Sequence, residues 1–155
     1  MITLTDEMKE AVDIIQNSNQ SLYITGKAGT GKTTFLRHIV SNINKRFIIT
    51  ASTGIAAVNA GGVTLHSLLN IPFGVLTESE NVRSGYRPEK AALLQNVDAL
   101  IIDEISMVRP DVIDYVDRKL KMYRGSEEPF GGIQIIMFGD LFQLPPVVKK
   151  DEEYI

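Results

Sequence analysis

One stretch of this 155-residue chain decides its fold: Leu22-Tyr23-Ile24-Thr25-Gly26-Lys27-Ala28-Gly29-Thr30-Gly31-Lys32-Thr33. An apolar run leads through glycines to a lysine and a hydroxyl, which is the spacing of a phosphate-binding loop between a strand and a helix. Glycine lets successive backbone N–H groups turn inward around an anion, and the following helix directs its positive end at the same anion. The stretch therefore predicts a nucleoside triphosphate site.

Each residue type in this loop suits one task. We expect Lys32 to reach the β- and γ-phosphates and Thr33 to ligate magnesium through its hydroxyl. Lys27 is expected to face solvent, and Thr34 can instead pack against the helix or cap it. An ordinary glycine-rich turn is disfavoured, because glycine makes up only about 7% of an average protein and a chance match at this spacing is rare. The predicted nucleotide-binding residues are Gly26, Lys27, Ala28, Gly29, Thr30, Gly31, Lys32, Thr33 and Thr34.

Strands and helices alternate along the rest of the chain. Strand-like apolar runs alternate with segments of helical period, and the first helix has Thr5 as a plausible N-cap. Apolar strands joined by helices indicate a parallel sheet that is covered on both faces. The expected fold class is therefore α/β, of the P-loop NTPase type. The expected strands are 22–25, 47–49, 100–102 and 133–138, and the expected helices are 6–16, 35–43, 56–60 and 111–122.

An acidic pair follows the third predicted strand, in Leu100-Ile101-Ile102-Asp103-Glu104. Alone, such a pair is commonplace. Beside a phosphate loop, one carboxylate at a strand end can hold magnesium, usually through water, and the other can orient the attacking water. We expect Thr33 and Asp103 to be the metal ligands and Glu104 to be the catalytic base, with both acids converging on the terminal phosphate.

A glutamine lies just beyond the last predicted strand, in Phe138-Gly139-Asp140-Leu141-Phe142-Gln143-Leu144-Pro145. Gln143 could lie beside the γ-phosphate and donate its amide to phosphate or water. It could equally be a polar loop residue before a proline stop, and that alternative would be favoured if the segment stood alone. The predicted catalytic set is Lys32, Asp103, Glu104 and Gln143.

Composition excludes several classes of protein. The formal net charge is -3, so bulk attraction to nucleic acid phosphate is not expected. The absence of cysteine excludes disulfides and thiolate zinc sites and favours a reducing, cytoplasmic setting. The chain has no secretory signal at its start and no apolar run of about 18 residues, so no membrane association is expected. Its length fits one domain.

The order of the motifs resembles superfamily 1B DNA helicases of the petite-integration-frequency (Pif) type, with RecD-like helicases next nearest. The resemblance covers nearly the whole chain, and it implies a RecA-like fold with ATP and magnesium as cofactors. Five segments carry it: Gly26 to Thr34, Ala51 to Ala57 with Gly61 to Ser67, Asp103 to Val108, Pro129 to Gln134, and Gly139 to Val147.

The resemblance also implies an activity and partners. Such a helicase translocates 5′ to 3′ on single-stranded DNA and unwinds a duplex or fork, here as a monomer in the cytoplasm, or on the nucleoid in a bacterium. These motors close a second domain around ATP, and nothing after Val148 resembles that domain. We therefore expect residues 1–155 to be the first motor domain of a longer helicase. Without the arginines of the second domain, hydrolysis should be slower by about 10³ to 10⁵.

By the same resemblance, four residues would lie on the single-strand track, namely Thr53, Gly54, His66 and Ser67. Hydroxyls and backbone N–H groups there would meet phosphates, and planar side chains would meet bases. A lone histidine such as His66 is more often structural. Residues 70–88 combine prolines, glycines and mixed charge and predict a long surface loop. Phe73 in that loop could stack on a base or tuck beneath the loop, and packing beneath it is slightly favoured.

One residue departs from the family pattern. Relatives carry an adenine-reading glutamine in a segment resembling Leu4-Thr5-Asp6-Glu7, and here that place is Met8. A thioether cannot form the paired amide hydrogen bonds that recognise adenine. We therefore predict a weak preference for ATP over GTP.

Two other functions fit a phosphate loop. A P-loop kinase would need a lid with arginines, for which the sequence shows no suited cluster. A nucleotide switch without turnover has less need of the water-orienting Glu104. Stimulation of ATP hydrolysis by single-stranded DNA would separate the helicase from both alternatives.

Overall fold

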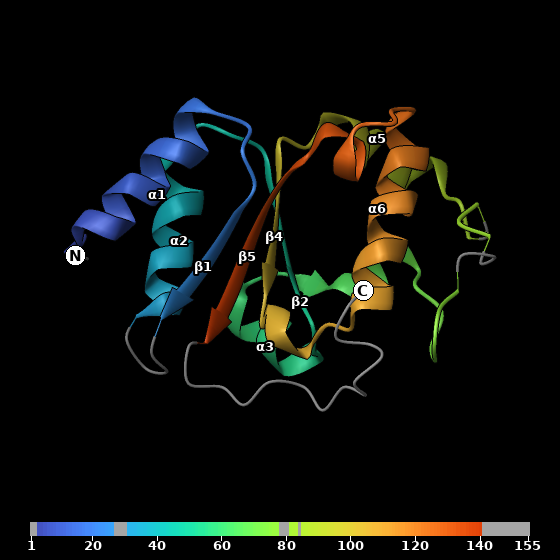
Figure 1. Cartoon of the computed structure of the whole chain (residues 1–155), viewed down its shortest axis with the longest axis horizontal. Coiled ribbons are helices and arrows are strands. Elements are labelled where there is room, and N and C mark those ends of the chain that lie inside the picture. Colours follow the sequence, from blue (N-terminus) through green and yellow to red (C-terminus); the bar gives the residue numbers. More distant parts are fainter. Residues whose placement is uncertain (1–2, 27–30, 78–80, 84, 141–155) are drawn as a thin grey trace.

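Five parallel strands form one sheet in the order β1-β5-β4-β2-β3 (Figure 1). The computed structural model describes residues 3–26, 31–77, 81–83 and 85–140. β1, which leads into the phosphate loop, pairs along its described length with β5, and β5 pairs with β4. The strands are β1 (Leu22–Gly26), β2 (Phe47–Ala51), β3 (Val63–Thr64), β4 (Ala99–Asp103) and β5 (Gln134–Asp140).

Helices connect successive strands, as the parallel arrangement requires. Thr5 is the N-cap of the first helix, and its hydroxyl accepts a hydrogen bond from the Met8 N–H at 3.1 Å. The helices are α1 (Asp6–Asn17), α2 (Lys32–Asn42), α3 (Gly54–Ala60), α4 (Leu65–Leu69), α5 (Pro88–Asn96) and α6 (Pro110–Arg124), with 3-10 turns η1 (Ile105–Met107) and η2 (Pro129–Gly132). In the described ranges, no helix is both long enough and apolar enough to cross a bilayer.

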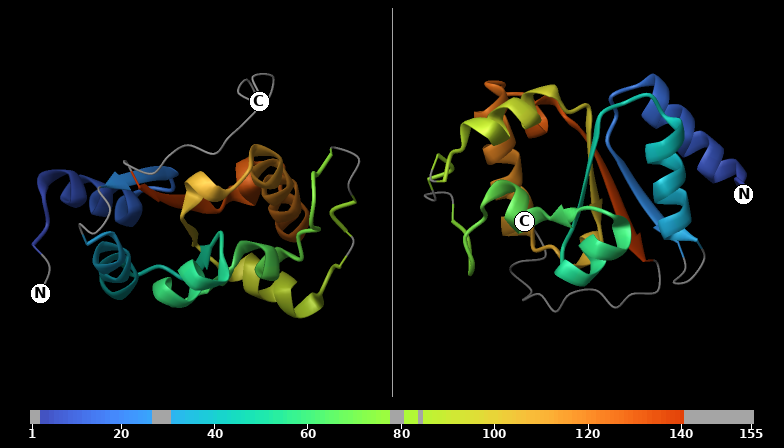
Figure 2. Two further views of the ribbon diagram at one scale, coloured as in Figure 1. Left: turned by 90° about the horizontal axis from the view of Figure 1, so that it is seen from below. Right: turned by 180° about the vertical axis from the view of Figure 1, so that it is seen from behind.

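Helices lie on both sides of the sheet (Figure 2), and its two faces bury separate hydrophobic clusters. Side chains alternate along a strand, so Leu100 and Ile102 of β4 pack on one side with residues of α4, α5 and α6. Ala99 and Ile101 of the same strand pack on the other side with residues of α1 and α2. All five residues of β4 are buried. The predicted α/β class, with a parallel sheet and helices on both faces, is confirmed.

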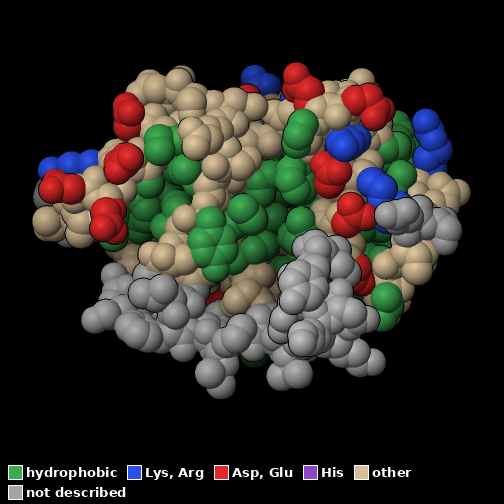
Figure 3. Space-filling model, viewed as in Figure 1, with side chains coloured by type: hydrophobic (Ala, Val, Ile, Leu, Met, Phe, Trp, Pro, Cys, Tyr) green, Lys and Arg blue, Asp and Glu red, His purple; other side chains and the backbone are tan. Residues whose placement is uncertain are grey.

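On the face of the sheet that packs against α4, α5 and α6, the helices leave the region near β1 partly uncovered. Leu22 and Ile24 pack against the α1 and α2 cluster, so Tyr23 between them points to the opposite face, where it is 54% exposed. Figure 3 shows apolar side chains gathered over β1 and β5, between α1 and α6. The helices on this face therefore cover the centre of the sheet better than its β1 edge.

All the predicted strands and helices are present, with boundaries that differ by a few residues. Besides the two 3-10 turns, the sequence missed β3 and α4, which are too short to show a period, and α5. Only Ala91 and Leu94 of α5 are buried, while Leu93 is 49% exposed, so its sequence lacks a clear apolar stripe. The predicted surface loop at 70–88 is partly wrong as well. Ile71 and Leu76 are buried in the core and anchor that segment.

The turn between α6 and β5 requires glycine. Gly131 has φ of +65°, and a Cβ atom there would lie 2.6 Å from the Leu120 carbonyl oxygen on α6. Arg124 also donates to the Gly131 carbonyl at 2.7 Å and to the Leu94 carbonyl at 2.8 Å. The turn, α5 and α6 are therefore held together at one point.

We predict that Gly131→Ala lowers the free energy of unfolding by about 2 to 4 kcal/mol, because it adds a backbone clash to a left-handed conformation. Gly125 is a matched control, since its φ is +59° but a Cβ there meets nothing within 4 Å. Gly125→Ala should cost only about 1 to 2 kcal/mol. Urea denaturation of both variants measures the difference, and equal losses would contradict the predicted close contact.

Candidate nucleotide-binding site

The predicted site residues gather where parallel strands end. The carboxyl ends of β1 and β4 lie at the same edge of the sheet, with β5 between them. Gly31 precedes α2 with φ of +88°, a left-handed conformation that favours glycine, and its carbonyl accepts the Phe35 N–H at 2.8 Å. Lys32 is the first residue of α2. Predicted loop residues Lys27, Ala28, Gly29 and Thr30 lie outside the described residues.

Lys32 connects this turn to the acidic pair. Its Nζ lies 2.8 Å from Asp103 Oδ1 and 3.5 Å from Glu104 Oε1. The side chains of Lys32, Asp103 and Glu104 are 19%, 7% and 31% exposed. Charged groups with so little access to water need partners of opposite charge. Here the ammonium and the two carboxylates are partners for each other. The structure therefore brings both acids into contact with the phosphate-loop lysine.

The surroundings keep Lys32 charged. Burial disfavours the ammonium, but the Asp103 hydrogen bond and the charges of Asp103 and Glu104 outweigh it, and the pKa of Lys32 is raised above 10.5. At neutral pH the side chain is a cation with three N–H donors. A phosphate oxygen would compete with the Asp103 carboxylate for the same donors.

Glu104 has an unusual backbone. Its φ is +57° and its ψ is 45°, in the left-handed region that a residue with a side chain rarely adopts. Its N–H donates to Asp103 Oδ1 at 2.9 Å, and its carbonyl accepts the Met107 N–H that closes η1. Ser52, which follows β2, donates its N–H to the Asp103 carbonyl at 3.3 Å. These bonds fix the conformation that directs the Glu104 carboxylate toward Lys32.

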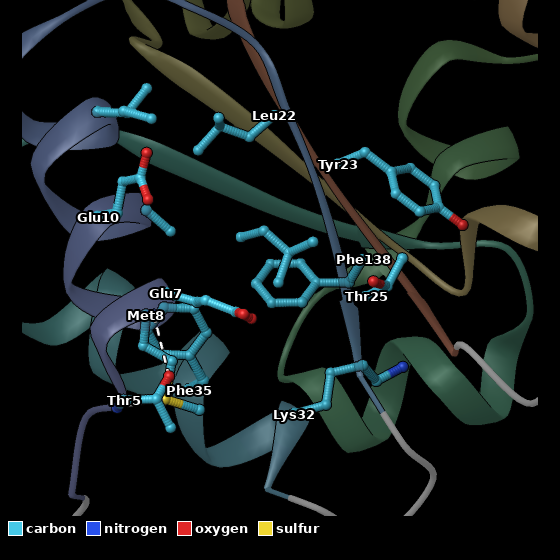
Figure 4. Close-up of a pocket in the computed structure, with 13 residues that line it drawn as sticks. Thr5, Glu7, Met8, Glu10, Leu22, Tyr23, Thr25, Lys32, Phe35 and Phe138 are labelled. Atoms are coloured by element: carbon cyan, nitrogen blue, oxygen red, sulfur yellow. Dashed lines mark hydrogen bonds between the residues drawn. The ribbon is translucent and has the colours of Figure 1, made fainter.

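A cavity of about 440 Å³ opens beside Lys32, between α1 and β1 (Figure 4). Met8, Phe35 and Phe138 give it apolar walls, and Thr25 and Lys32 lie at one end. Phe35 and Phe138 were predicted only as members of a helix and a strand, because an apolar period does not reveal which residues also border a cavity. The Met8 sulfur accepts the Thr5 N–H at 3.5 Å, so this side chain belongs both to the helix cap and to the cavity wall.

The predicted metal ligands belong to elements that meet at this edge. Thr33 is half-buried in the first turn of α2 and Asp103 ends β4, while Thr34 is exposed. No group of three or more His, Cys, Asp or Glu suited to a metal occurs within the described ranges. Gln143 lies outside the described residues.

The predicted DNA residues follow β2 and β3. Ala51 pairs with Thr64 in the sheet, so the segments after these residues leave from the same edge. The exposed Thr53 is the N-cap of α3, and its hydroxyl accepts the Ala56 N–H at 3.2 Å. Gly54 and Ser67 are exposed as well, and His66 is half-buried.

The packing predicted for Phe73 is wrong. Its side chain is 95% exposed, and its ring stacks on His66 at a centroid distance of 6.2 Å and an interplanar angle of 14°. Prolines and glycines around it indicated a loop but could not reveal its orientation, which depends on the buried Ile71 and Leu76 on either side.

These features define a class of protein. A glycine turn from a parallel strand into a helix, a lysine that begins this helix, and a carboxylate pair at the end of a second strand are typical of P-loop nucleotide-binding proteins. The sequence profile of PIF1-like helicases matches residues 3–154. The chain belongs to the PIF1-like helicase family.

Individual relatives agree with this assignment. The chain is 39% identical to ATP-dependent DNA helicase RRM3 of Saccharomyces cerevisiae over 99% of its own length and 22% of that protein. It is 43% identical to ATP-dependent DNA helicase PIF1 of Rattus norvegicus over 86% of its length and 21% of that protein. The chain thus spans about a fifth of the curated relatives that it matches.

Solved structures show the same likeness. Bacteroides Pif1 bound to ssDNA is 52% identical with a TM-score of 0.88, and a Bacteroides Pif1 in complex with ADP-AlF4 is 52% identical with a TM-score of 0.90. Each match covers 99% of this chain and 36% of the solved one. Pif1 helicase from Candida albicans is 38% identical with a TM-score of 0.82, over 97% of this chain and 35% of its own.

The backbone of Glu104 provides a test of stored strain. We predict that Glu104→Gly is more stable than Glu104→Gln by about 0.5 to 1 kcal/mol, because glycine relieves a left-handed cost of about 1 to 2 kcal/mol and loses part of that gain to chain entropy. Both variants remove the same charge, so comparing them in urea isolates the backbone term. A Gly variant no more stable than the Gln variant would show that the conformation is unstrained.

Proposed function

We propose that this chain is the ATP-binding motor region of a DNA helicase that translocates 5′ to 3′ on single-stranded DNA and unwinds duplex or forked DNA. The observation that carries the proposal is the contact of the Lys32 ammonium with Asp103 and Glu104 beside a cavity large enough for a nucleotide base. A lysine in contact with two acids suits an NTPase that hydrolyses its ligand rather than one that only binds it. Family membership supplies the substrate class.

The donor set suits magnesium. The Thr33 hydroxyl and the Asp103 carboxylate are hard oxygen ligands, which Mg²⁺ prefers over nitrogen or sulfur. When bound, the ion would neutralise charge on the phosphates. The N–H groups of Lys32 would donate to the β- and γ-phosphates instead of to Asp103. This exchange would free the Asp103 carboxylate to join the ligands of the metal. Gly26 to Thr34 would hold the triphosphate through backbone N–H groups.

Hydrolysis would depend on Glu104. Its carboxylate is 31% exposed, so water can reach it, and its left-handed backbone holds it beside Lys32. It would accept a proton from the attacking water, while Gln143 would contact water or the γ-phosphate. A second domain would supply the remaining positive charge, and the limited share of the relatives' length that this chain spans is compatible with such a domain.

Single-stranded DNA would lie along the edge formed after β2 and β3. The Thr53 hydroxyl accepts one hydrogen bond as a cap and keeps its own proton for a phosphate oxygen. Gly54 and Ser67 would offer backbone and hydroxyl contacts, and His66 would meet a base. The Bacteroides relative bound to ssDNA supports this class of ligand, and another relative was solved to explain unwinding at forked dsDNA by two coordinating helicases. We propose that a single protomer, in the cytoplasm, binds both the nucleotide and the DNA strand.

In the full-length protein, we expect Glu104→Gln to reduce DNA-stimulated ATP hydrolysis by about 10² to 10⁴ while nucleotide affinity stays within a few-fold. Lys32→Ala should instead weaken nucleotide binding by about 10-fold or more, because charged hydrogen bonds to phosphate are lost. Glu89→Gln is the control, since Glu89 is an exposed acid in the first turn of α5 that does not line the cavity. Loss of nucleotide binding in Glu104→Gln, or a wild-type enzyme that single-stranded DNA does not stimulate, would contradict the proposal.

Met8 in the cavity wall makes base selectivity testable. Wild type should bind ATP and GTP with similar affinity, and Met8→Gln should raise the preference for ATP by about 10-fold through two new amide hydrogen bonds. Met8→Leu should leave the ratio unchanged, because it alters the apolar wall without adding an amide. Competition binding of the two nucleotides gives the ratio. A strong ATP preference in wild type would show that another group reads the base.

A further inference from the structure

A carboxylate at the start of α6 ties that helix to the segment that carries Phe73. Asp111 Oδ2 accepts the Leu76 N–H at 2.8 Å, and its Oδ1 accepts Arg109 Nε at 2.9 Å. The Asp111 side chain is 17% exposed, and the Leu76 side chain is buried in the core. The backbone at Leu76 is therefore held by its side chain on one side and by Asp111 on the other.

Asp111 is held as an anion. Burial alone would raise the pKa of its carboxyl, but the Leu76 N–H and the Arg109 guanidinium outweigh burial and hold the pKa below 3.8. Its position in the first turn of α6 also places negative charge at the positive end of the helix dipole. A hydrogen bond to a charged acceptor is stronger than one between neutral groups, so the bond to Leu76 is a firm connection.

The short segment between Glu104 and Asp111 is held by backbone hydrogen bonds. The Glu104 carbonyl accepts the Met107 N–H at 3.0 Å, and the Ile105 carbonyl accepts the Val108 N–H at 2.9 Å. Arg109 follows at once as the N-cap of α6. Glu104 is thus linked to Asp111 through one 3-10 turn and the start of a helix, which are both hydrogen-bonded.

A second bond strengthens the connection at its other end. Arg118 lies two turns beyond Asp111 on α6, on the same face, and its Nη2 donates to the Thr77 carbonyl at 3.1 Å. The exposed Phe73, stacked on His66, lies three residues before Leu76. A cleft of about 250 Å³ lies between these rings and Met107 and Arg109, so residues from both ends of the connection line the same space.

We propose that Asp111 is a positioning residue that couples the nucleotide site to the DNA track, by tying Leu76, and with it Phe73 and His66, to the turn that follows Glu104. The inference rests on the proposed function and adds its route of regulation. A displacement of Glu104 on nucleotide binding would move the start of α6 and the segment at Leu76 together. Since coupling between two sites is reciprocal, bound DNA would act on the nucleotide site through the same contacts.

The test measures this coupling in the full-length protein. The affinity of a fluorescent oligo-dT strand is determined with and without a non-hydrolysable Mg-ATP analogue, and the ratio of the two is the coupling factor. We expect Asp111→Ala to reduce that factor by about 5-fold or more, within the usual range of allosteric coupling. Asp111→Asn keeps an acceptor for Leu76 but loses the charge, so about a 2-fold reduction is expected. Affinity for the analogue without DNA should stay unchanged in both variants.

Glu89→Ala is the matched control, because Glu89 is an exposed acid in the first turn of the neighbouring helix α5. Coupling in Asp111→Ala equal to that in Glu89→Ala overturns the inference. A parallel loss of DNA-free analogue affinity also overturns it, since Asp111 would then be only a structural brace. If the Ala variant does not fold, unchanged coupling in Asp111→Asn overturns the inference instead. If the wild type binds both the strand and the analogue but shows no coupling between them, the inference is overturned and the proposed function is not. If the wild type binds neither, the proposed function is contradicted.

Discussion

The bond between Lys32 Nζ and Asp103 Oδ1 joins segments that lie 71 residues apart in sequence, and the candidate site depends on it. It can form only because β1 and β4 run parallel and end at the same edge, with β5 as the spacer. Ion pairs this poorly hydrated contribute little net stability, since desolvation offsets much of the attraction. The value of this pair is positional, because it fixes a cation and two anions where a triphosphate and its metal would exchange partners with them.

The strand order connects that edge to the rest of the molecule. β4 lies between β5 and β2, so its acids have β5 and, beyond it, the phosphate-loop strand β1 on one side, and the segments after β2 and β3 on the other. Asp103 receives a hydrogen bond from the backbone of Ser52, and the turn after Glu104 leads directly to Asp111 and Leu76. The acids therefore border both the proposed nucleotide site and the proposed DNA track, and the strained backbone of Glu104 lies between the two.

The sequence contained the pattern for the sheet and for the charged cluster, because both follow from local rules. Apolar runs predicted β1, β2, β4 and β5, and the convergence of Lys32 with Asp103 follows from parallel strands that end together. Other features depend on tertiary contacts. The exposure of Phe73 depends on where Ile71 and Leu76 are anchored, and α5 is defined by the space beside α6 rather than by a stripe of its own. Nor could spacing alone reveal Asp111, whose partner is a backbone N–H 35 residues away.

Nucleotide binding at this site requires the Lys32 ammonium to exchange a carboxylate for a phosphate, and a crystal structure of the chain with a non-hydrolysable Mg-nucleotide tests that exchange most directly. We predict that Lys32 Nζ leaves Asp103 Oδ1 and contacts the β- and γ-phosphates, while Asp103 turns to the metal shell and the base enters the cavity beside Met8. A nucleotide bound elsewhere, with the 2.8 Å contact between Lys32 and Asp103 intact, would contradict this exchange and the site built on it.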